Sequence, residues 1–285
     1  MSASQQSTYG YRPMTVADLP AAHALSVQLK WPHRLDDWAM LLRISDGFVA
    51  LDGERLIGTA FACPQGDFST IGLVIVSDAY QGKGIGRQLM ERALDACQPR
   101  IPVLNATLAG APLYVSQGFV EFGRILQHQG QAQVPAITPL ADGEKCRPLH
   151  DADKARVLEL ANAGTGLERS TVIADLLEVV EHSVGIERDG QLRAFAMLRP
   201  YGRGRVIGPV VCENLEQAQH LIGVLLAQVP DTFVRIDIPA DCGLSDWLET
   251  AGLKQVDTVA QMARGTPPQA SNGVRQFALV TQAIA

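Results

Sequence analysis

Several features that define common functional classes are missing from this chain of 285 residues. It has no run of about 18 apolar residues, so no membrane-spanning helix is expected. Acidic residues outnumber basic ones by 30 to 24, and the net charge of −6 argues against a surface that binds nucleic acid. The five cysteines form no Cys-x-x-Cys pair, so neither a disulfide framework nor a metal site is indicated.

The first ten residues, MSASQQSTYG, also lack the apolar core of a signal peptide. Together with the widely spaced cysteines, this indicates a cytoplasmic protein with reduced thiols. Apolar residues make up 47% of the chain and charged residues 19%, which is ordinary for a soluble globular protein. The length suits one large domain or two ordinary ones.

What the sequence does contain is a weak internal repeat. Three segments of the first half return in the second: 12–25 as 147–160, 70–81 as 206–217, and 113–119 as 247–253. The matches keep their order and a nearly constant shift of 134 to 136 residues, which points to a duplication. We therefore interpret the chain as two copies of one unit and predict an N-terminal domain over 10–130 and a C-terminal domain over 144–285.

The segment between the copies has the composition of a linker. Residues 127–144, QHQGQAQVPAITPLADGE, are rich in Gln, Pro and Gly, although part of the segment is a candidate edge strand of the first copy. Near the other end of the chain, residues 275–284 (RQFALVTQAI) have the pattern of a strand that completes a sheet.

The first copy alternates strand and helix patterns in the order β-α-α-β-β-β-α-β-α-β. Antiparallel strands come first and a βαβ crossover follows. The predicted fold class is therefore α/β of the α+β kind, with a mixed, mostly antiparallel sheet flanked by helices. In the second helix, LDDWAMLLRIS, Asp36 is the expected N-cap.

The crossover carries an unusual loop, residues 74–90, VIVSDAYQGKGIGRQLM. An apolar strand ends there, three glycines follow at alternate positions, and a helix begins. Unpaired backbone N–H groups and the positive end of the helix dipole form an anion site, and glycines let phosphate oxygens approach the backbone. The loop thus favours a pyrophosphate ligand, and a glycine-rich turn without a ligand is the alternative.

Two common phosphate motifs do not fit this loop. No Lys-Ser or Lys-Thr follows the glycines, as a P-loop requires, and the next strand (PVLNAT) offers no acid for the ribose of a dinucleotide. Instead, YQGKGIG resembles the Q/R-x-x-G-x-G/A motif of the GCN5-related N-acetyltransferases (GNAT), and APLYVSQGF resembles the family's LYxxxGF segment. The chain as a whole is similar to tandem members of that superfamily, with a degenerate second copy.

This resemblance implies acetyl-CoA as cosubstrate and assigns the residues that bind it. Its pyrophosphate would lie on the loop, and its pantetheine arm and acetyl carbonyl on the backbone of the preceding strand, where an N–H gives oxyanion-type stabilisation. The residues implied are Val74, Ile75, Val76, Gln81, Gly82, Lys83, Gly84, Ile85, Gly86 and Arg87. For Arg87, a solvated surface position is the alternative, and the apolar strand side chains also belong to the core.

Tyr114 of the LYxxxGF-like segment is the implied general acid, because a neutral phenol can protonate a departing CoA thiolate. The alternative is a buried structural aromatic. No acid stands in the central strand STIGLVIV, so the base must come from a water chain or from elsewhere. Residues 31–38 occupy the family's usual acceptor position, and His33, Asp36 and Asp37 are candidates for binding the acceptor or accepting its proton. The alternatives are that His33 is a surface residue and that Asp36 caps a helix.

The second copy has lost the features that mark the first. Gly82, Gly84 and Gly86 correspond to Ala218, His220 and Ile222, and Tyr114 corresponds to Leu248. We expect this copy to keep the fold, not to bind acetyl-CoA, and to brace the first copy or to form a wall of the acceptor pocket. Arg169 and its neighbour Glu168 could meet a charged acceptor there, or form an ordinary ion pair at a helix start.

Two functions follow. The first is an acyltransferase that transfers acetyl from acetyl-CoA to a primary amine of a small molecule by direct attack. The second is a non-catalytic sensor or scaffold that binds acetyl-CoA or CoA. Neither involves nucleic acid, membrane or metal, and the duplication is compatible with a monomer or a homodimer.

Overall fold

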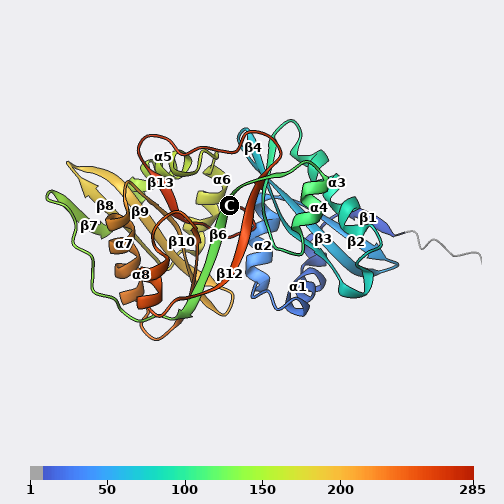
Figure 1. The fold of residues 1–285 in the computed structure, drawn as a ribbon, viewed down its shortest axis with the longest axis horizontal. Coiled ribbons are helices and arrows are strands. Elements are labelled where there is room, and N and C mark those ends of the chain that lie inside the picture. The colour runs from blue at the N-terminus through green and yellow to red at the C-terminus, as the bar shows by residue number, and fades with distance from the viewer. Residues whose placement is uncertain (1–8) are drawn as a thin grey trace, which may run out of the picture.

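A computed structural model describes residues 9–285. All thirteen strands belong to one continuous sheet, in the order β1-β2-β3-β4-β5-β12-β6-β11-β10-β9-β8-β7, with β13 paired to β10. The two halves of the chain lie side by side, and β6 and β12 pass between them at the centre (Figure 1). No helix within residues 9–285 has both the length and the apolar character needed to cross a membrane.

The first half follows the predicted element order. Its elements are β1 (Gly10–Pro13), α1 (Leu19–Gln28), α2 (Leu35–Ile44), β2 (Asp46–Asp52), β3 (Arg55–Gln65), β4 (Phe68–Val76), α3 (Ile85–Cys97), β5 (Ile101–Ala106), α4 (Ala111–Ser116) and β6 (Val120–Gln131). Strands β1 to β4 pair antiparallel, whereas β4 and β5 pair parallel across the α3 crossover. The mixed α/β fold class expected from the sequence is confirmed.

The second half repeats this order. Its elements are β7 (Glu144–Pro148), α5 (Lys154–Thr165), α6 (Ser170–Val179), β8 (His182–Arg188), β9 (Gln191–Tyr201), β10 (Gly204–Cys212), α7 (Leu215–Ala227), β11 (Phe233–Pro239), α8 (Ser245–Thr250), β12 (Lys254–Ala263) and β13 (Arg275–Ala278). Strands β10 and β11 are its parallel pair.

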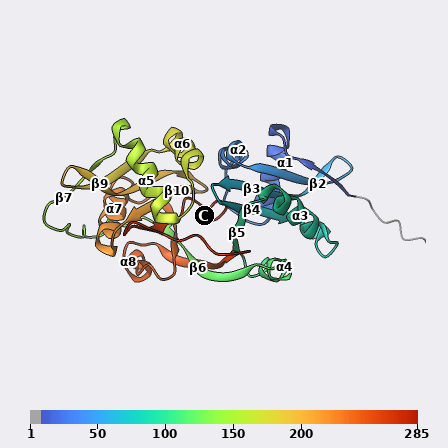
Figure 2. The ribbon, with the colours of Figure 1, turned by 90° about the horizontal axis from the view of Figure 1, so that it is seen from above.

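Helices cover both faces of the sheet because each buries an apolar stripe. In α3, for example, Leu89, Ala93 and Cys97 recur every four residues and are fully buried against β2 and β3. On the other face, α1 and α2 of the first half share one core with α5 and α6 of the second. Helices α2 and α6 meet at the centre of the molecule (Figure 2).

The two halves exchange strands. Strand β12 of the second half lies between β5 and β6 of the first, and β6 in turn pairs with β11 of the second half. The expectation of an edge strand in the linker is corrected here, because residues 127–131 form the end of β6 and pair in the interior of the sheet with β11. The exchange joins the two halves through main-chain hydrogen bonds.

The predicted strand at 275–284 is shorter in the structure. Residues Arg275–Ala278 form β13, and the chain then runs on between the halves as an irregular segment. Leu279 donates its N–H to the carbonyl of Asp237, and the side chains of Val280 and Ile284 enter the shared core. We call residues 279–285 the tail segment.

Candidate active site

The site begins where the parallel strands β4 and β5 separate. Their pairing runs only as far as Ile71 and Leu104. Leu73 has a left-handed backbone (φ 48°), and the β3–β4 register shifts beside it, so β4 carries a bulge at this point. The buried hydroxyl of Thr59 donates a 2.7 Å hydrogen bond to the carbonyl of Leu73 and holds the bulge. Beyond it, β4 still pairs with β3 but no longer with β5.

A cavity of about 700 Å³ occupies this opening. The N-terminal half lines it with the end of β4, with the loop before α3, and with the start of α4. The second half contributes Arg235 and Asp257 from its strands and Gln282 and Ala283 from the tail segment. Both copies therefore line the cavity, which is compatible with the second of the two roles expected of the second copy, that of a wall.

The loop before α3 and the first two residues of that helix, 81–86, form one end of this cavity, and we call this segment the glycine loop. Gly82 and Gly84 have left-handed backbones (φ 74° and 81°), and no atom lies within 4 Å of where their Cβ atoms would be. Glycine is thus favoured there by conformation and leaves open space beside the backbone. Gly84 is the N-cap of α3 and offers no side-chain acceptor, so no cap side chain occupies the N–H groups of the first helical turn.

Most of the residues expected to bind acetyl-CoA come together at this cavity. Those that line it are Val74, Ile75, Val76, Gln81, Gly82, Gly84, Ile85 and Gly86. The amide of Gln81 donates to the carbonyl of Val76 and to the carboxylate of Asp78, which fixes the start of the loop. Lys83 and Arg87 are exposed outside the lining, and the Lys83 ammonium lies 4.9 Å from the centre of the Tyr80 ring.

Tyr114 also lines the cavity, from helix α4. Its side chain is buried beside Phe119, with the ring centres 6.1 Å apart. Burial raises the pKa of Tyr114 to about 12, so the phenol stays protonated over the physiological pH range.

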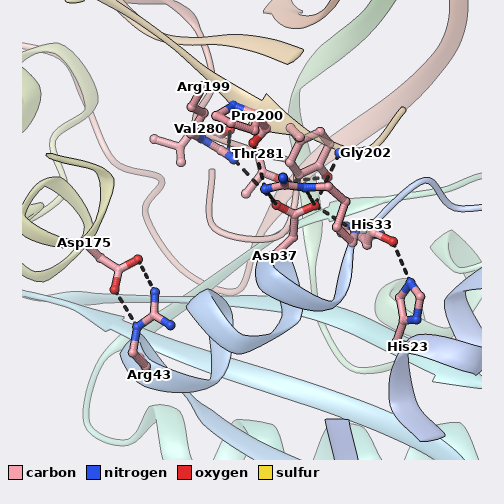
Figure 3. Close-up of polar contacts among 12 residues, drawn as sticks. His23, His33, Asp37, Arg43, Asp175, Arg199, Pro200, Gly202, Val280 and Thr281 are labelled. Atoms are coloured by element: carbon pink, nitrogen blue, oxygen red, sulfur yellow. Dashed lines mark hydrogen bonds and ion pairs between the residues drawn. The ribbon is translucent and has the colours of Figure 1, made fainter. Parts of the chain in front are cut away.

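His33 lies in the opposite wall, on the segment between α1 and α2. Its ring packs against Trp38 and, edge to face, against Tyr201 of β9, so His33 is a half-buried residue of the cavity wall and not a fully exposed one. Burial, with help from the nearby Arg235, lowers the pKa of His33 to about 4 and keeps the imidazole neutral near pH 7. Its main-chain carbonyl lies 3.0 Å from Nε2 of His23 (Figure 3).

Asp37 holds this wall in place. It accepts a 2.8 Å hydrogen bond from the N–H of Arg34, pairs with the Arg34 guanidinium, and contacts the N–H of Gly202 in the second half. Arg199, fully buried, lies 4.0 Å from the same carboxylate and donates to the carbonyl of Val280 in the tail segment (Figure 3). The candidate acid Asp37 is therefore a structural anchor between the halves.

Two expected acceptor residues lie elsewhere. Asp36 is neither the N-cap of α2 nor part of the cavity: the helix is capped at Arg34, Asp37 closes the capping box, and Asp36 is exposed in the first turn. Arg169 is fully buried away from the cavity and donates to the carbonyls of Ile284 and Ala285. Its role is to hold the tail segment. The alternative ion pair with Glu168 is also wrong, because that carboxylate accepts from Ser170.

Sequence reasoning missed the polar wall of the second half. Arg235 and Asp237 stand two residues apart in β11, on the same face. The signal is visible in the strand sequence FVRIDIP, where two opposite charges interrupt an apolar strand on one face. Such charges in a buried strand need partners, and here they find each other beside the cavity.

The second half has no equivalent opening. Its parallel strands β10 and β11 separate in the same way, but β13 pairs with β10 at the gap, and the tail segment bonds to Asp237 of β11. At the start of α7, the side chain of Asn214 caps the N–H of Gln217 at 2.9 Å. The first turn of α7 is thus occupied by protein groups. No cluster of three or more potential metal ligands occurs within residues 9–285.

Comparison with known proteins agrees with this duplicated architecture. Residues 43–121 and residues 157–278 each match a family model described as an acetyltransferase (GNAT) domain. The two matches together span more than half of the chain. The protein therefore belongs to the GNAT acetyltransferases and is an acyltransferase with two such domains in tandem.

Individual relatives extend the match over most of the chain. An uncharacterized N-acetyltransferase of Bacillus subtilis, YitH, is 28% identical over 228 residues, which are 77% of each protein. A holothin acyltransferase of a Pseudoalteromonas species is 24% identical over 275 residues, 93% of this chain and 91% of the relative. The solved structure of a tandem GNAT protein from the clavulanic acid biosynthesis pathway superimposes with a TM-score of 0.63 at 16% identity, covering 93% of this chain and all of the other.

Proposed function

We propose that the N-terminal half, residues 10–130, transfers acetyl from acetyl-CoA to a primary amine of a small molecule by direct attack. The observation that carries this proposal is the single cavity in which the opened end of β4, the glycine loop and Tyr114 meet. Acetyl-CoA supplies the activated thioester when it is bound. The holothin acyltransferase among the relatives supports a small-molecule acceptor.

The glycine loop has the properties needed for the pyrophosphate. The backbone N–H groups of residues 82–86 would donate to phosphate oxygens, and the N-terminus of α3 favours negative charge there. Gln81 stands at the mouth of the loop. Lys83 and Arg87, exposed beside it, would add positive charge from outside the cavity.

Strand β4 would orient the reacting group. Beyond the bulge, residues 74–76 have no partner strand on the β5 side, so main-chain groups there are open to the pantetheine arm. An N–H of this segment would donate to the acetyl oxygen as negative charge develops on it. The half-buried Val74 and Val76 line the same space and would exclude water.

Tyr114 would act on the departing sulfur. Its pKa of about 12 keeps the proton available. The pKa of a free thiol is about 8.5, which is about 3.5 below that of Tyr114. Complete transfer of the phenol proton to the thiolate would therefore be unfavourable by about 5 kcal/mol. The phenol would therefore stabilise the leaving thiolate chiefly as a hydrogen-bond donor, with protonation completed as the product leaves. His33, neutral in the opposite wall, would contact the acceptor.

Turnover distinguishes this enzyme from a non-catalytic acetyl-CoA-binding module. We expect the native protein to release CoA in the presence of amines, and Tyr114→Phe to lower kcat about 100-fold while acetyl-CoA still binds. Release of CoA is followed with a thiol reagent, and binding by calorimetry. Val115→Ala, on the exposed side of the same helix, is the matched control and keeps its rate. A native protein that binds acetyl-CoA but acetylates no amine of a broad panel supports the module instead.

A further inference from the structure

Where the second half of the chain lines the cavity, four polar side chains form a row across three strands: Arg235, Asp237, Gln127 and Asp257. We call them the polar row. Asp237 of β11 pairs directly with Gln127 of β6, which pairs directly with Asp257 of β12. Directly paired residues of neighbouring strands point to the same face of a sheet, and Arg235 shares that face with Asp237. Arg235, Gln127 and Asp257 all line the cavity.

Arg235 is the only arginine of this row, and only part of its guanidinium is engaged. Nε lies 3.1 and 3.0 Å from the two oxygens of Asp237, and Nη2 lies 2.9 Å from one of them. Gln282 donates a further 3.1 Å hydrogen bond to Asp237, so this buried carboxylate is well satisfied. Within residues 9–285, Nη1 of Arg235 has no protein acceptor; most of the side chain is buried, but this nitrogen is accessible from the cavity.

Asp257 is held differently. The β6–β12 register shifts between Gln255 and Asp257, and the residue is exposed. One carboxylate oxygen accepts from the N–H of Thr258 at 2.8 Å. Among the described residues no lysine or arginine forms a salt bridge with it, and it is the one acidic side chain that lines the cavity. The polar row therefore offers two groups to a ligand, the Nη1 donor of Arg235 and the carboxylate of Asp257.

We propose that this row, Arg235 with Asp257, recognises the acceptor, and that the acceptor is a small primary amine which also carries a carbonyl or carboxylate oxygen. Nη1 of Arg235 donates to that oxygen, and Asp257 attracts the protonated amine. The ammonium group gives up one proton to solvent at the exposed Asp257, and the neutral nitrogen then attacks the acetyl carbon. A simple polyamine would offer Nη1 no acceptor and place a second cation beside it, whereas a purely acidic molecule would be repelled by the carboxylate of Asp257. The inference rests on the proposed acetyl transfer and names its substrate class.

The test uses amines in matched sets. Phenylalaninamide, phenylalanine and 2-phenylethylamine share the 2-phenylethylamine skeleton. Only the first two carry a carbonyl or carboxylate oxygen. We expect kcat/KM with at least one of the oxygen-bearing compounds to exceed that with 2-phenylethylamine about tenfold or more. The amide and the amino acid distinguish a neutral carbonyl from a carboxylate as the source of the oxygen.

Variants then assign the preference to residues. Arg235→Lys keeps the charge opposite Asp237, and we expect it to bring the ratio between oxygen-bearing and plain amines close to one. Asp257→Asn should raise KM about tenfold for all three amines and leave kcat and the KM for acetyl-CoA unchanged. Asp246→Asn, the same change of charge on the exposed start of α8, is the control and alters neither value.

The outcomes distinguish a failure of this inference from a failure of the proposed acetyl transfer. Amines that are acetylated equally well with and without the oxygen overturn the substrate class alone. A preference that survives in a folded, acetyl-CoA-binding Arg235→Lys variant overturns the role of Arg235, and an unchanged KM in Asp257→Asn overturns that of Asp257. If no amine is acetylated although acetyl-CoA binds, the proposed transfer falls and the inference falls with it.

Discussion

The parallel strand pair β4–β5 in the first half and its counterpart β10–β11 in the second separate at the same place in the repeat. Gly72 and Gly208 occupy equivalent positions beside the two gaps, and a Cβ on either would collide with a carbonyl of the C-terminal segment, that of Ala283 or of Leu279. In the second half this segment, as β13, fills the gap. In the first half it only crosses beside the gap and becomes a wall of the cavity.

The difference shows how a duplicated domain can keep its fold and lose a site. The second half retains the separated strands, so the backbone plan alone does not make a binding site. The two halves differ in what occupies the gap between the parallel strands. In the second half a strand fills the gap and the side chain of Asn214 caps α7, whereas in the first half the gap is open and α3 begins at Gly84. The filled half then contributes polar residues to the open one.

The largest effect is expected at the open loop. Gly84→Glu places a side chain and a negative charge where phosphate is expected, on a left-handed backbone, and should weaken acetyl-CoA binding at least about 100-fold. The matched control is Gly190→Glu, an exposed glycine of similar backbone (φ 72°) with equally open surroundings in the β8–β9 turn. Calorimetry with both variants checks the assignment; equal affinity in the two would remove the loop from the site.

The two equivalent glycines sharpen the comparison further. Gly72→Ala and Gly208→Ala should each lower the free energy of unfolding by about 2 kcal/mol, because the tail segment must move aside. Only Gly72→Ala should also lower turnover, since residues Gln282 and Ala283 line the active cavity. Urea unfolding and CoA release measure the two effects.

Gly10→Ala serves as the control for both changes, because its Cβ would make only an ordinary 3.7 Å contact. Turnover lost to the same degree in Gly72→Ala and Gly208→Ala would show that the tail segment acts on both halves alike, and would contradict its assignment as a wall of the first-half cavity alone.

A smaller effect is expected where the halves remain the same. Asp18 pairs with Arg12, and Asp153 pairs with Arg147 at the equivalent place. Hydrogen bonds from these arginines lower the pKa of each carboxyl to about 2, from 3.8. Because the folded pKa lies below the unfolded one, the stabilisation is complete above about pH 4 and is lost as the pH falls towards 2.

Asp18→Asn and Asp153→Asn should therefore each cost about 1 kcal/mol of unfolding free energy at pH 6, a value reduced for the exposure of the arginines, and almost nothing near pH 2. Urea unfolding at several pH values, with Asp246→Asn for comparison, measures this. Destabilisation that is independent of pH in both variants would contradict a role through the charge.

Much of the architecture was accessible from the sequence because it rests on local pattern. The repeat indicated two copies with one element order, and the glycines at alternate positions after an apolar strand marked a loop that the structure places in the cavity. The family match confirms the acetyltransferase class that the motifs indicated.

The strand exchange was not accessible in this way, since the pattern of a strand specifies which face is buried and not which strand lies beside it. Nothing local to β12 indicates a place between β5 and β6. The same limit explains the acceptor residues. The burial of Arg169 depends on the tail segment more than 100 residues away, and the choice between Asp36 and Asp37 depends on a helix that is capped at Arg34.

The most direct test of the comparison between the halves is a calorimetric titration of the native chain with acetyl-CoA. We predict one site per chain, because the loop and gap of the first half are open and those of the second are filled. Two sites per chain would show that the second half binds as well, and the absence of any binding would contradict the assignment of the cavity itself.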